Sequence, residues 1–283
     1  MEKKKKGYFR VSVPQESATP TVSFINKFSG RCGKIVIRWK IIQPFSIVNS
    51  ILSFGKETEK TEALYRFYRL GDRLLLPGSS LKGMARTYTA AVFGLTFADE
   101  LYGHCDYGII ERDADRRNKR INHASKVFFE DVFIDEKALT KAPTMAAFSK
   151  NKAVPGTFRI YKLARSEEMK TRSFPIECLP PGTFFDSEIQ YVGLLDEHLS
   201  GFLLSLGLQE HYSFPLKCGR GKSTGYGALK ASVLKVLEFD RRSAFSPLID
   251  ITEVIKGKLT QTPGKIAKKP LENLEILRIH SSQ

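Results

Sequence analysis

An apolar run that stops at a proline, then small residues and then a helical pattern, constrains the fold of this chain more than any other feature. Arg73 to Pro77 is typical of a short strand, and Gly78-Ser79-Ser80 offers a turn with two candidate helix N-caps. Apolar residues recur at helical spacing from Leu81 onward, which predicts a helix from about Ser80 to Phe93. The predicted order is strand, small-residue turn, helix.

Other segments alternate between strand and helix patterns. Strands are predicted at residues 33–45, 127–134, 184–192 and 229–239, and a helical apolar pattern covers residues 199–208. Loops marked by glycine separate these segments. Strands and helices that interleave in this way indicate an α+β fold. Two split β-α-β halves, or one such unit with large insertions, fit the pattern.

Positive charge dominates the composition. The chain has 45 Lys and Arg residues against 30 Asp and Glu residues, which gives a formal net charge of +15. Such an excess attracts polyanions, and nucleic acid is the commonest polyanionic partner of proteins. The composition therefore favours nucleic-acid binding. The charged surface of a thermophilic protein and a membrane-surface protein are the alternatives.

The start of the chain and its cysteines bear on the cellular setting. Met1 to Arg10 is rich in lysine, without an apolar signal segment, and no run in the chain approaches the length of a membrane span. None of the four cysteines forms a C-x-x-C pair, so neither a disulfide framework nor a standard metal site is expected. We expect a cytoplasmic protein with no membrane association and no cofactor.

The turn before the predicted helix has the chemistry of a phosphate-binding site. The first turn of a helix has free N–H groups and a partial positive charge, and small residues let a phosphate approach it. Ser79 and Ser80 add hydroxyl donors, and Lys82 and Arg86 lie four residues apart on one helix face. An ordinary capped helix start with a solvent-facing lysine is the alternative.

A second loop, Cys218 to Gly227, combines glycines with basic residues. Its Gly221-Lys222-Ser223 step invites comparison with a nucleotide-binding P-loop. That motif needs a glycine where this chain has Leu216, and it needs a helix where Gly225 and Gly227 follow. Nucleoside triphosphate hydrolysis is therefore excluded. A backbone this rich in glycine can follow another backbone closely, and a hairpin that only turns the chain is the alternative.

These two segments together resemble a known family. Leu76 to Gly83, followed by Arg86, resembles the signature of the RAMP superfamily, the repeat-associated proteins of CRISPR effector complexes, and is closest to type III subunits. Gly219 to Gly227 resembles the second hallmark of the family and lies, as it should, late in the chain before a strand. The resemblance implies a ferredoxin-like, RNA-recognition-motif-like core with large insertions and a thumb-like hairpin.

The resemblance also implies partners and contact residues. It implies a CRISPR RNA-binding subunit of a type III effector ribonucleoprotein in antiviral defence, which assembles with other RAMP subunits along the guide RNA and meets target RNA. The residues expected to contact RNA are Gly78, Ser79, Ser80, Lys82, Gly83, Arg86, Gly219, Arg220, Gly221, Lys222, Ser223 and Gly225. The candidates for a thumb that presses between guide and target bases are Phe148, Arg159, Lys162, Arg165 and Phe174.

The expected domain organisation follows from these motifs. Residues 1–32 are an N-terminal arm, residues 33–240 the RAMP RNA-binding domain, and residues 241–283 a C-terminal extension. Insertions into the domain are expected at about residues 46–70, 104–122 and 140–175.

Whether the resemblance extends to RNA cleavage depends on one loop of the chain. In type III complexes the repeated backbone subunits cut target RNA with a metal-assisted aspartate in the loop after the first strand. The corresponding loop here, Pro44 to Gly55, contains no Asp or Glu, and Asp72 is the remaining candidate. A non-catalytic subunit is therefore favoured, and a nuclease that uses Mg²⁺ is the alternative. A stand-alone RAMP RNA-binding or processing protein is a second alternative, although processing relatives usually need a histidine near the N-terminus and the first one here is His104.

Overall fold

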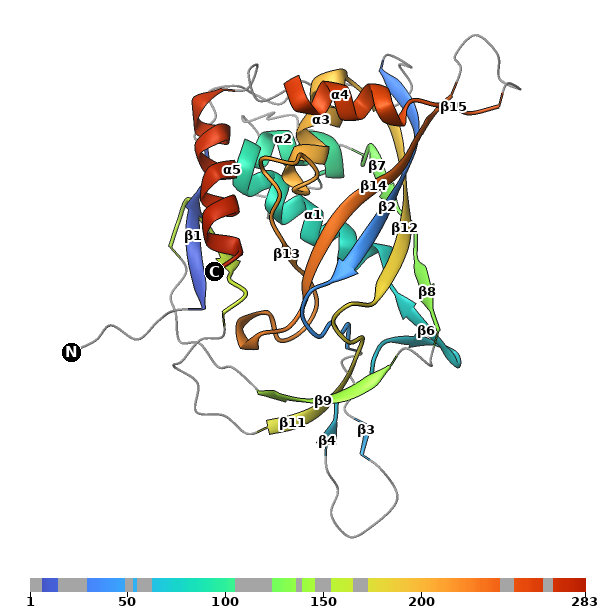
Figure 1. Ribbon diagram of the computed structural model, residues 1–283, viewed down its shortest axis with the longest axis vertical. Helices are drawn as coiled ribbons and strands as arrows, with labels where there is room; N and C mark the ends of the chain where they lie inside the picture. Colours follow the sequence, from blue (N-terminus) through green and yellow to red (C-terminus); the bar gives the residue numbers. More distant parts are fainter. Residues whose placement is uncertain are drawn as a thin grey trace, which may run out of the picture.

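A computed structural model describes residues 7–14, 30–48, 53–54, 63–104, 124–135, 139–145, 154–164, 173–239, 247–261 and 267–283. A long antiparallel sheet with helices on one side of it forms the centre of the molecule (Figure 1). Its main elements, in chain order, are β2 (Arg31–Ile41), α1 (Gly78–Phe93), β7 (Val127–Phe129), β12 (Phe184–Leu194), α3 (Asp196–Ser205) and β14 (Ala228–Glu238).

This succession is the β-α-β-β-α-β unit of the ferredoxin-like fold. The strands lie side by side in the order β14–β2–β12–β7, and each neighbouring pair is antiparallel. The fourth strand of the unit thus lies beside the first, and the third lies between the first and the second. The predicted α+β, ferredoxin-like core is confirmed, and the described residues form one such unit with insertions.

Alternating burial defines the two faces of β2. Side chains along a strand point alternately to its two faces, so a period of two separates the core from the outer face. Arg38 and Lys40 point outward, and Arg38 forms two hydrogen bonds with Asp186 of β12. The inward row, which is fully buried, is Ile35, Ile37, Trp39 and Ile41.

Three more helices complete the helical layer: α2 (Leu95–Tyr102), α4 (Thr252–Gln261) and α5 (Lys268–Ser281). In Figure 1, α4 lies near β14 at the top, and α5 lies at the left. The fully buried Asn273 of α5 donates from Nδ2 to the carbonyl oxygens of Ser12 (3.1 Å) and Ala91 (2.8 Å). A buried amide bonded to two other segments fixes the position of α5 against α1.

Smaller sheets surround the core. One ribbon pairs β1 (Tyr8–Ser12) with β10 (Thr157–Tyr161), and another pairs β9 (Thr140–Met145) with β11 (Ser173–Cys178). The remaining strands are β3 (Ser53–Phe54), β4 (Ala63–Leu64), β5 (Arg69–Leu70), β6 (Arg73–Leu76), β8 (Val132–Ile134), β13 (Leu216–Lys217) and β15 (Ile249–Asp250). β3 pairs with β4, β6 pairs with β5 and β8, and β14 pairs with β13 and β15.

The segment in which the thumb-like hairpin was expected belongs to two separate ladders: β9 pairs with β11, which Figure 1 shows beyond the end of the central sheet, and the intervening β10 pairs with β1. One prediction at element level is wrong. The single strand expected at residues 127–134 is two strands in different sheets, separated by Glu130 and Asp131. Asp131 in this connection accepts a hydrogen bond from the first residue of α1, Gly78, at 2.7 Å.

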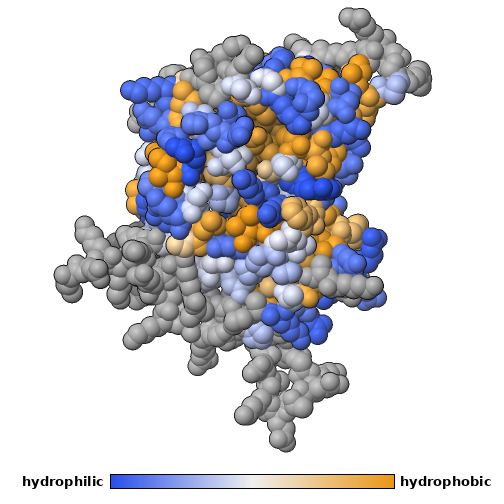
Figure 2. Space-filling view, in the orientation of Figure 1, coloured by the Kyte–Doolittle hydropathy of each residue, from blue (hydrophilic) through white to orange (hydrophobic). Residues whose placement is uncertain are grey.

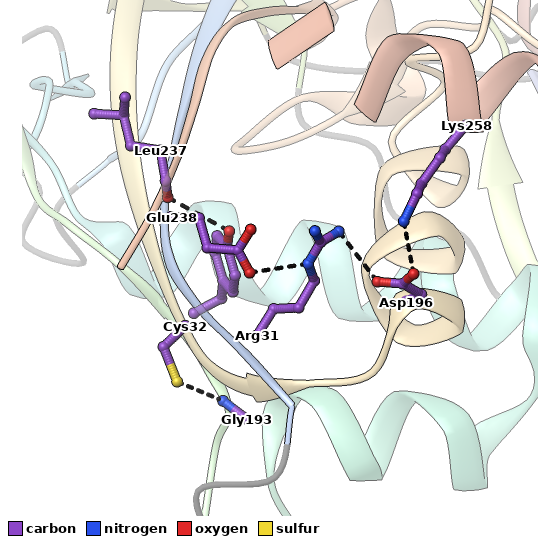
Figure 3. Close-up of polar contacts among 8 residues, drawn as sticks. Arg31, Cys32, Gly193, Asp196, Leu237, Glu238 and Lys258 are labelled. Atoms are coloured by element: carbon purple, nitrogen blue, oxygen red, sulfur yellow. Dashed lines mark hydrogen bonds and ion pairs between the residues drawn. The ribbon is translucent and has the colours of Figure 1, made fainter. Parts of the chain in front are cut away.

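A polar network closes the end of the sheet where β2 begins (Figure 3). Arg31 of β2 bonds to Glu238 of β14 at 2.9 Å and to Asp196 of α3 at 3.1 Å. Lys258 of α4 reaches the other oxygen of Asp196 at 2.7 Å. The side chain of Arg31 is only 21% exposed, so its pairs are less screened by solvent than surface pairs. The network ties α4 to the core at the end of β2 opposite Ile41.

Hydrophobic and hydrophilic residues are mixed on the face that Figure 2 shows, with apolar surface near α4 and β14. Exposed apolar residues in these elements and in the short β15 are Leu234, Val254 and Ile249. Within the described ranges, none of the helices combines the length and the apolar character that crossing a bilayer requires.

Candidate nucleic-acid interface

Two contacts bring the two sequence motifs together in space. The backbone N–H of Lys217, just before the glycine-rich loop (Cys218–Gly227), donates to the hydroxyl of Tyr88 in α1 at 2.9 Å. The thiol of Cys218 lies 3.6 Å from the carbonyl oxygen of Ser80 in the first turn of α1. Segments some 130 residues apart in the chain are therefore adjacent, because β13 joins the central sheet beside β14.

The first turn of α1 is held tightly by the two-residue connection between β7 and β8. Besides the bond from Gly78 to Asp131, a methyl group at Gly78 would lie 2.1 Å from the carbonyl oxygen of Phe129. No side chain fits there, so Gly78 is required by packing. Its N–H is already satisfied, and the carboxylate of Asp131 lies at the positive end of the helix. The part of the first turn left for a ligand is at Ser79 and Ser80.

The glycine-rich loop is shaped by its own backbone and by the chain after β2. The N–H of Gly227 donates to Pro44 O at 2.8 Å, and the N–H of Arg220 donates to Ser46 O at 2.9 Å. Gly219 has φ +77°, and a Cβ there would lie 2.2 Å from Ser46 O. Only glycine combines this left-handed conformation with so close an approach. The loop is therefore fixed in position rather than a simple turn.

A groove of about 340 Å³ lies between α1, the glycine-rich loop and β10. Its lining contains hydroxyl groups, small residues and three basic residues, and none of its residues is an Asp or Glu. Basic and hydroxyl side chains together with backbone N–H groups are the usual partners of nucleic-acid phosphates. The polar and small residues that line it are Ser79, Ser80, Gly83, Thr87, Tyr88, Arg159, Tyr161, Lys217, Cys218, Gly219 and Lys222.

The β1–β10 ribbon forms the wall of the groove that faces α1. Arg159 of β10 pairs in register with Arg10 of β1, and both guanidinium groups lie over the ring of Tyr8, at 4.7 Å and 5.9 Å. Contacts of a cation with an aromatic face restrict the long arginine side chain. Arg159, which the resemblance suggested for the thumb, is thus placed in the groove wall. Lys162, another thumb candidate, bonds to the side chain of Gln283 at 3.0 Å.

Lys82 and Arg86 do not line the groove. The ammonium of Lys82 donates to the hydroxyl of Ser125 at 2.8 Å, and Arg86 bonds to the carboxylate of Asp99 in α2. Burial, with a smaller contribution from the nearby charge of Arg86, lowers the pKa of Lys82 from its usual value. Both residues therefore have partners inside the protein, on a different side of α1 from Ser79 and Gly83. Their contact with RNA stays a prediction.

Lys217 lines the groove, and the motifs gave no sign of it. Its side chain is 5% exposed, and its ammonium donates to the side-chain oxygen of Gln43 and, at 3.0 Å, to the carbonyl oxygen of Tyr226. Burial lowers the pKa of Lys217 to about 7. The local sequence offers no signal for this burial, because it comes from pairing with β14 and from packing against α1.

The other predicted contact residues lie at the edge of the groove or outside the described residues. Arg220 is exposed and lies 4.1 Å over the ring of Tyr65. Gly221, Ser223 and Gly225 belong to the glycine-rich loop but do not line the groove. Phe148 and Arg165 fall outside the described residues, and only the backbone of Phe174, within β11, is described.

Asp72, the candidate for catalysis, lies exposed in the turn between β5 and β6 and does not line the groove. In the part of the chain that the structure describes, no three His, Cys, Asp or Glu side chains gather in a group that could hold a metal ion. The role of Asp72 in cleavage stays a prediction.

No protein-family model matches the sequence, and no curated protein matches it. Among solved structures, this chain is similar to a chain in the cryo-EM structure of the type III-B Cmr-beta bound to cognate target RNA. The two share 15% sequence identity with a TM-score of 0.43, and the match covers 74% of this chain but only 61% of that one. A likeness of this degree carries no functional argument, so the resemblance to RAMP proteins stays a prediction.

Proposed function

We propose that this chain is an RNA-binding subunit of a type III CRISPR effector ribonucleoprotein and that it grips the backbone of the guide RNA in the groove. The observation that carries the proposal is the lining of this groove. It gathers hydroxyl groups, small residues and three basic side chains from α1, β10 and the segment around the glycine-rich loop, without a carboxylate.

The groove contains the features that sequence-independent binding of a single strand requires. Such binding uses positive charge along the backbone and allows aromatic rings to stack on bases. Arg159 of β10 and Lys222 of the glycine-rich loop supply charge, and Tyr161 adds an aromatic ring to the same lining. The net charge of +15 adds long-range attraction for a polyanion. The CRISPR setting and the other RAMP subunits as partners rest on the two sequence motifs.

The first experiment removes the positive charges of Arg159 and Lys222. We expect Arg159→Ala combined with Lys222→Ala to weaken binding of a labelled single-stranded oligouridine by about tenfold or more. Each lost phosphate contact should also reduce the slope of log affinity against log salt by about 0.7. Fluorescence anisotropy across a salt series measures both quantities. A matched control, Lys256→Ala with Lys269→Ala, removes two charges from α4 and α5, outside the groove.

Equal losses of affinity in the two double variants would show that binding depends on net charge alone. That result would contradict the proposal that RNA binds in the groove. The CRISPR assignment has its own test. The chain is purified from cells that express a CRISPR array, and the copurified RNA is sequenced. Enrichment of guide RNA is expected, and RNA without array sequences would remove the CRISPR part of the proposal while leaving RNA binding intact.

A further inference from the structure

Lys217 is the one basic residue lining the groove that is buried. A lysine ammonium has three donor hydrogens and no acceptor. Within the described residues, its acceptors are the side-chain oxygen of Gln43 and the carbonyl oxygen of Tyr226, and both are uncharged. Two of the three hydrogens are therefore used by acceptors among the described residues, and the residue itself lines the groove. The acid-free lining also leaves the positive charge without a counter-charge there.

Two ionisable side chains beside Lys217, those of Tyr88 and Cys218, are buried. Burial raises the pKa of Cys218 to about 11, and burial also raises the pKa of Tyr88 above its usual value. No histidine, Asp or Glu lines the groove. The other titratable or charged residues that line the groove, from α1, the glycine-rich loop and β10, are Tyr88, Cys218, Lys222, Arg159 and Tyr161.

We infer that Lys217 is an anion-binding residue of the groove, which takes up a proton from solvent as a phosphodiester of the bound strand becomes its counter-charge. This inference rests on the proposed function of the groove and assigns a role to a residue that neither motif includes. The ligand class is a phosphodiester, because its charge is single and permanent and its oxygens accept hydrogen bonds.

The direction of the pH dependence follows from the burial of Lys217. Burial without a counter-charge disfavours the ammonium form in the free protein, which is why its pKa lies near 7. A bound phosphodiester favours the ammonium form, so the pKa is higher in the complex. Between these two values binding takes up a proton, and affinity falls as pH rises by at most about tenfold per pH unit for one linked proton. Below the lower value, affinity is independent of pH.

The test measures affinity of the wild-type chain for an oligouridine from about pH 6 to about pH 8.5 at constant salt. Uracil is chosen because it does not titrate in this range. We expect affinity to fall by about thirtyfold across the range. Calorimetry in buffers that differ in ionisation enthalpy should show proton uptake close to zero at about pH 6 and approaching one at about pH 8.5.

Two substitutions assign the linked proton to this residue. Lys217→Arg keeps a permanent charge and should remove most of the pH dependence, and Lys217→Met should bind weakly at all pH values. Persistence of the wild-type slope in a folded Lys217→Arg protein would overturn the inference. Wild-type binding without proton uptake would overturn it too, even if neither variant folds, and would leave the proposed function standing. Absence of oligouridine binding at low salt would overturn both.

Discussion

Helix α1 presents two neighbouring stripes of side chains that differ in what they contact. Residues four apart share a stripe, so Gly78, Lys82 and Arg86 form one stripe, and Ser79, Gly83 and Thr87 form the next. Each member of the first stripe contacts the protein: the β7–β8 connection, Ser125 and Asp99, respectively. The members of the second stripe line the groove.

The difference separates charge that holds the fold from charge that faces a ligand. The first stripe carries the basic residues of α1, but their hydrogen bonds stay within the molecule. The second stripe has no charge of its own and leaves room, and the positive charge beside it comes from β10, β13 and the glycine-rich loop. The second stripe, which consists of small residues and lies beside basic residues from other elements, is therefore the better candidate for a phosphate-binding surface. The first stripe carries charge, but its charged groups are hydrogen-bonded within the protein.

The largest expected effect on stability concerns Gly78, the first residue of the first stripe of α1. We expect Gly78→Ala to reduce the free energy of unfolding by about 1–3 kcal/mol, because the new methyl group would meet the carbonyl oxygen of Phe129 at 2.1 Å. Either the β7–β8 connection or the start of α1 must move. Urea unfolding measures the loss, and an unchanged midpoint would show that the close contact is not rigid.

Much of the core follows from local patterns in the sequence. The alternation in Gly33–Phe45 predicted β2, and the spacing from Ser80 to Phe93 predicted α1 to within two residues of its observed start at Gly78. These patterns succeed because each element buries one face or one stripe. The break at Asp131 was missed because the contact made there, the hydrogen bond with Gly78, joins residues 53 positions apart.

The groove was only partly predictable for the same reason. The two motifs identified Ser79, Ser80, Gly219 and Lys222, which the structure brings together. Arg159 faces them because β10 pairs with the N-terminal strand β1, and the residues around Arg159 do not reveal such a distant pairing. Local spacing placed Lys82 and Arg86 on one helix face correctly, but it contains no information on whether that face meets α2 or a ligand.

The next prediction tests the first stripe of α1 by removing its two positive charges. We expect Lys82→Ala combined with Arg86→Ala to lower the free energy of unfolding by about 1 kcal/mol, since partly exposed polar contacts contribute little each. RNA affinity should fall less than in the Arg159→Ala, Lys222→Ala protein. Thermal unfolding and anisotropy in the same buffer measure the two effects. A large loss of affinity at unchanged stability would instead make this stripe a direct RNA contact, as the family resemblance implies.

The smallest effect on stability is expected at Gly83, in the middle of the second stripe of α1. A methyl group there meets no atom within 4 Å, and alanine in a helix interior is favoured over glycine by about 0.5–1 kcal/mol. Gly83→Ala should therefore stabilise the protein while it narrows the groove and weakens oligouridine binding several-fold. Gly257 of α4 is equally unobstructed and lies outside the groove, so Gly257→Ala should give a similar stabilisation with unchanged affinity. Equal affinities for the two variants would mean that the strand does not approach α1 closely at Gly83, and the second stripe would lose its role in binding.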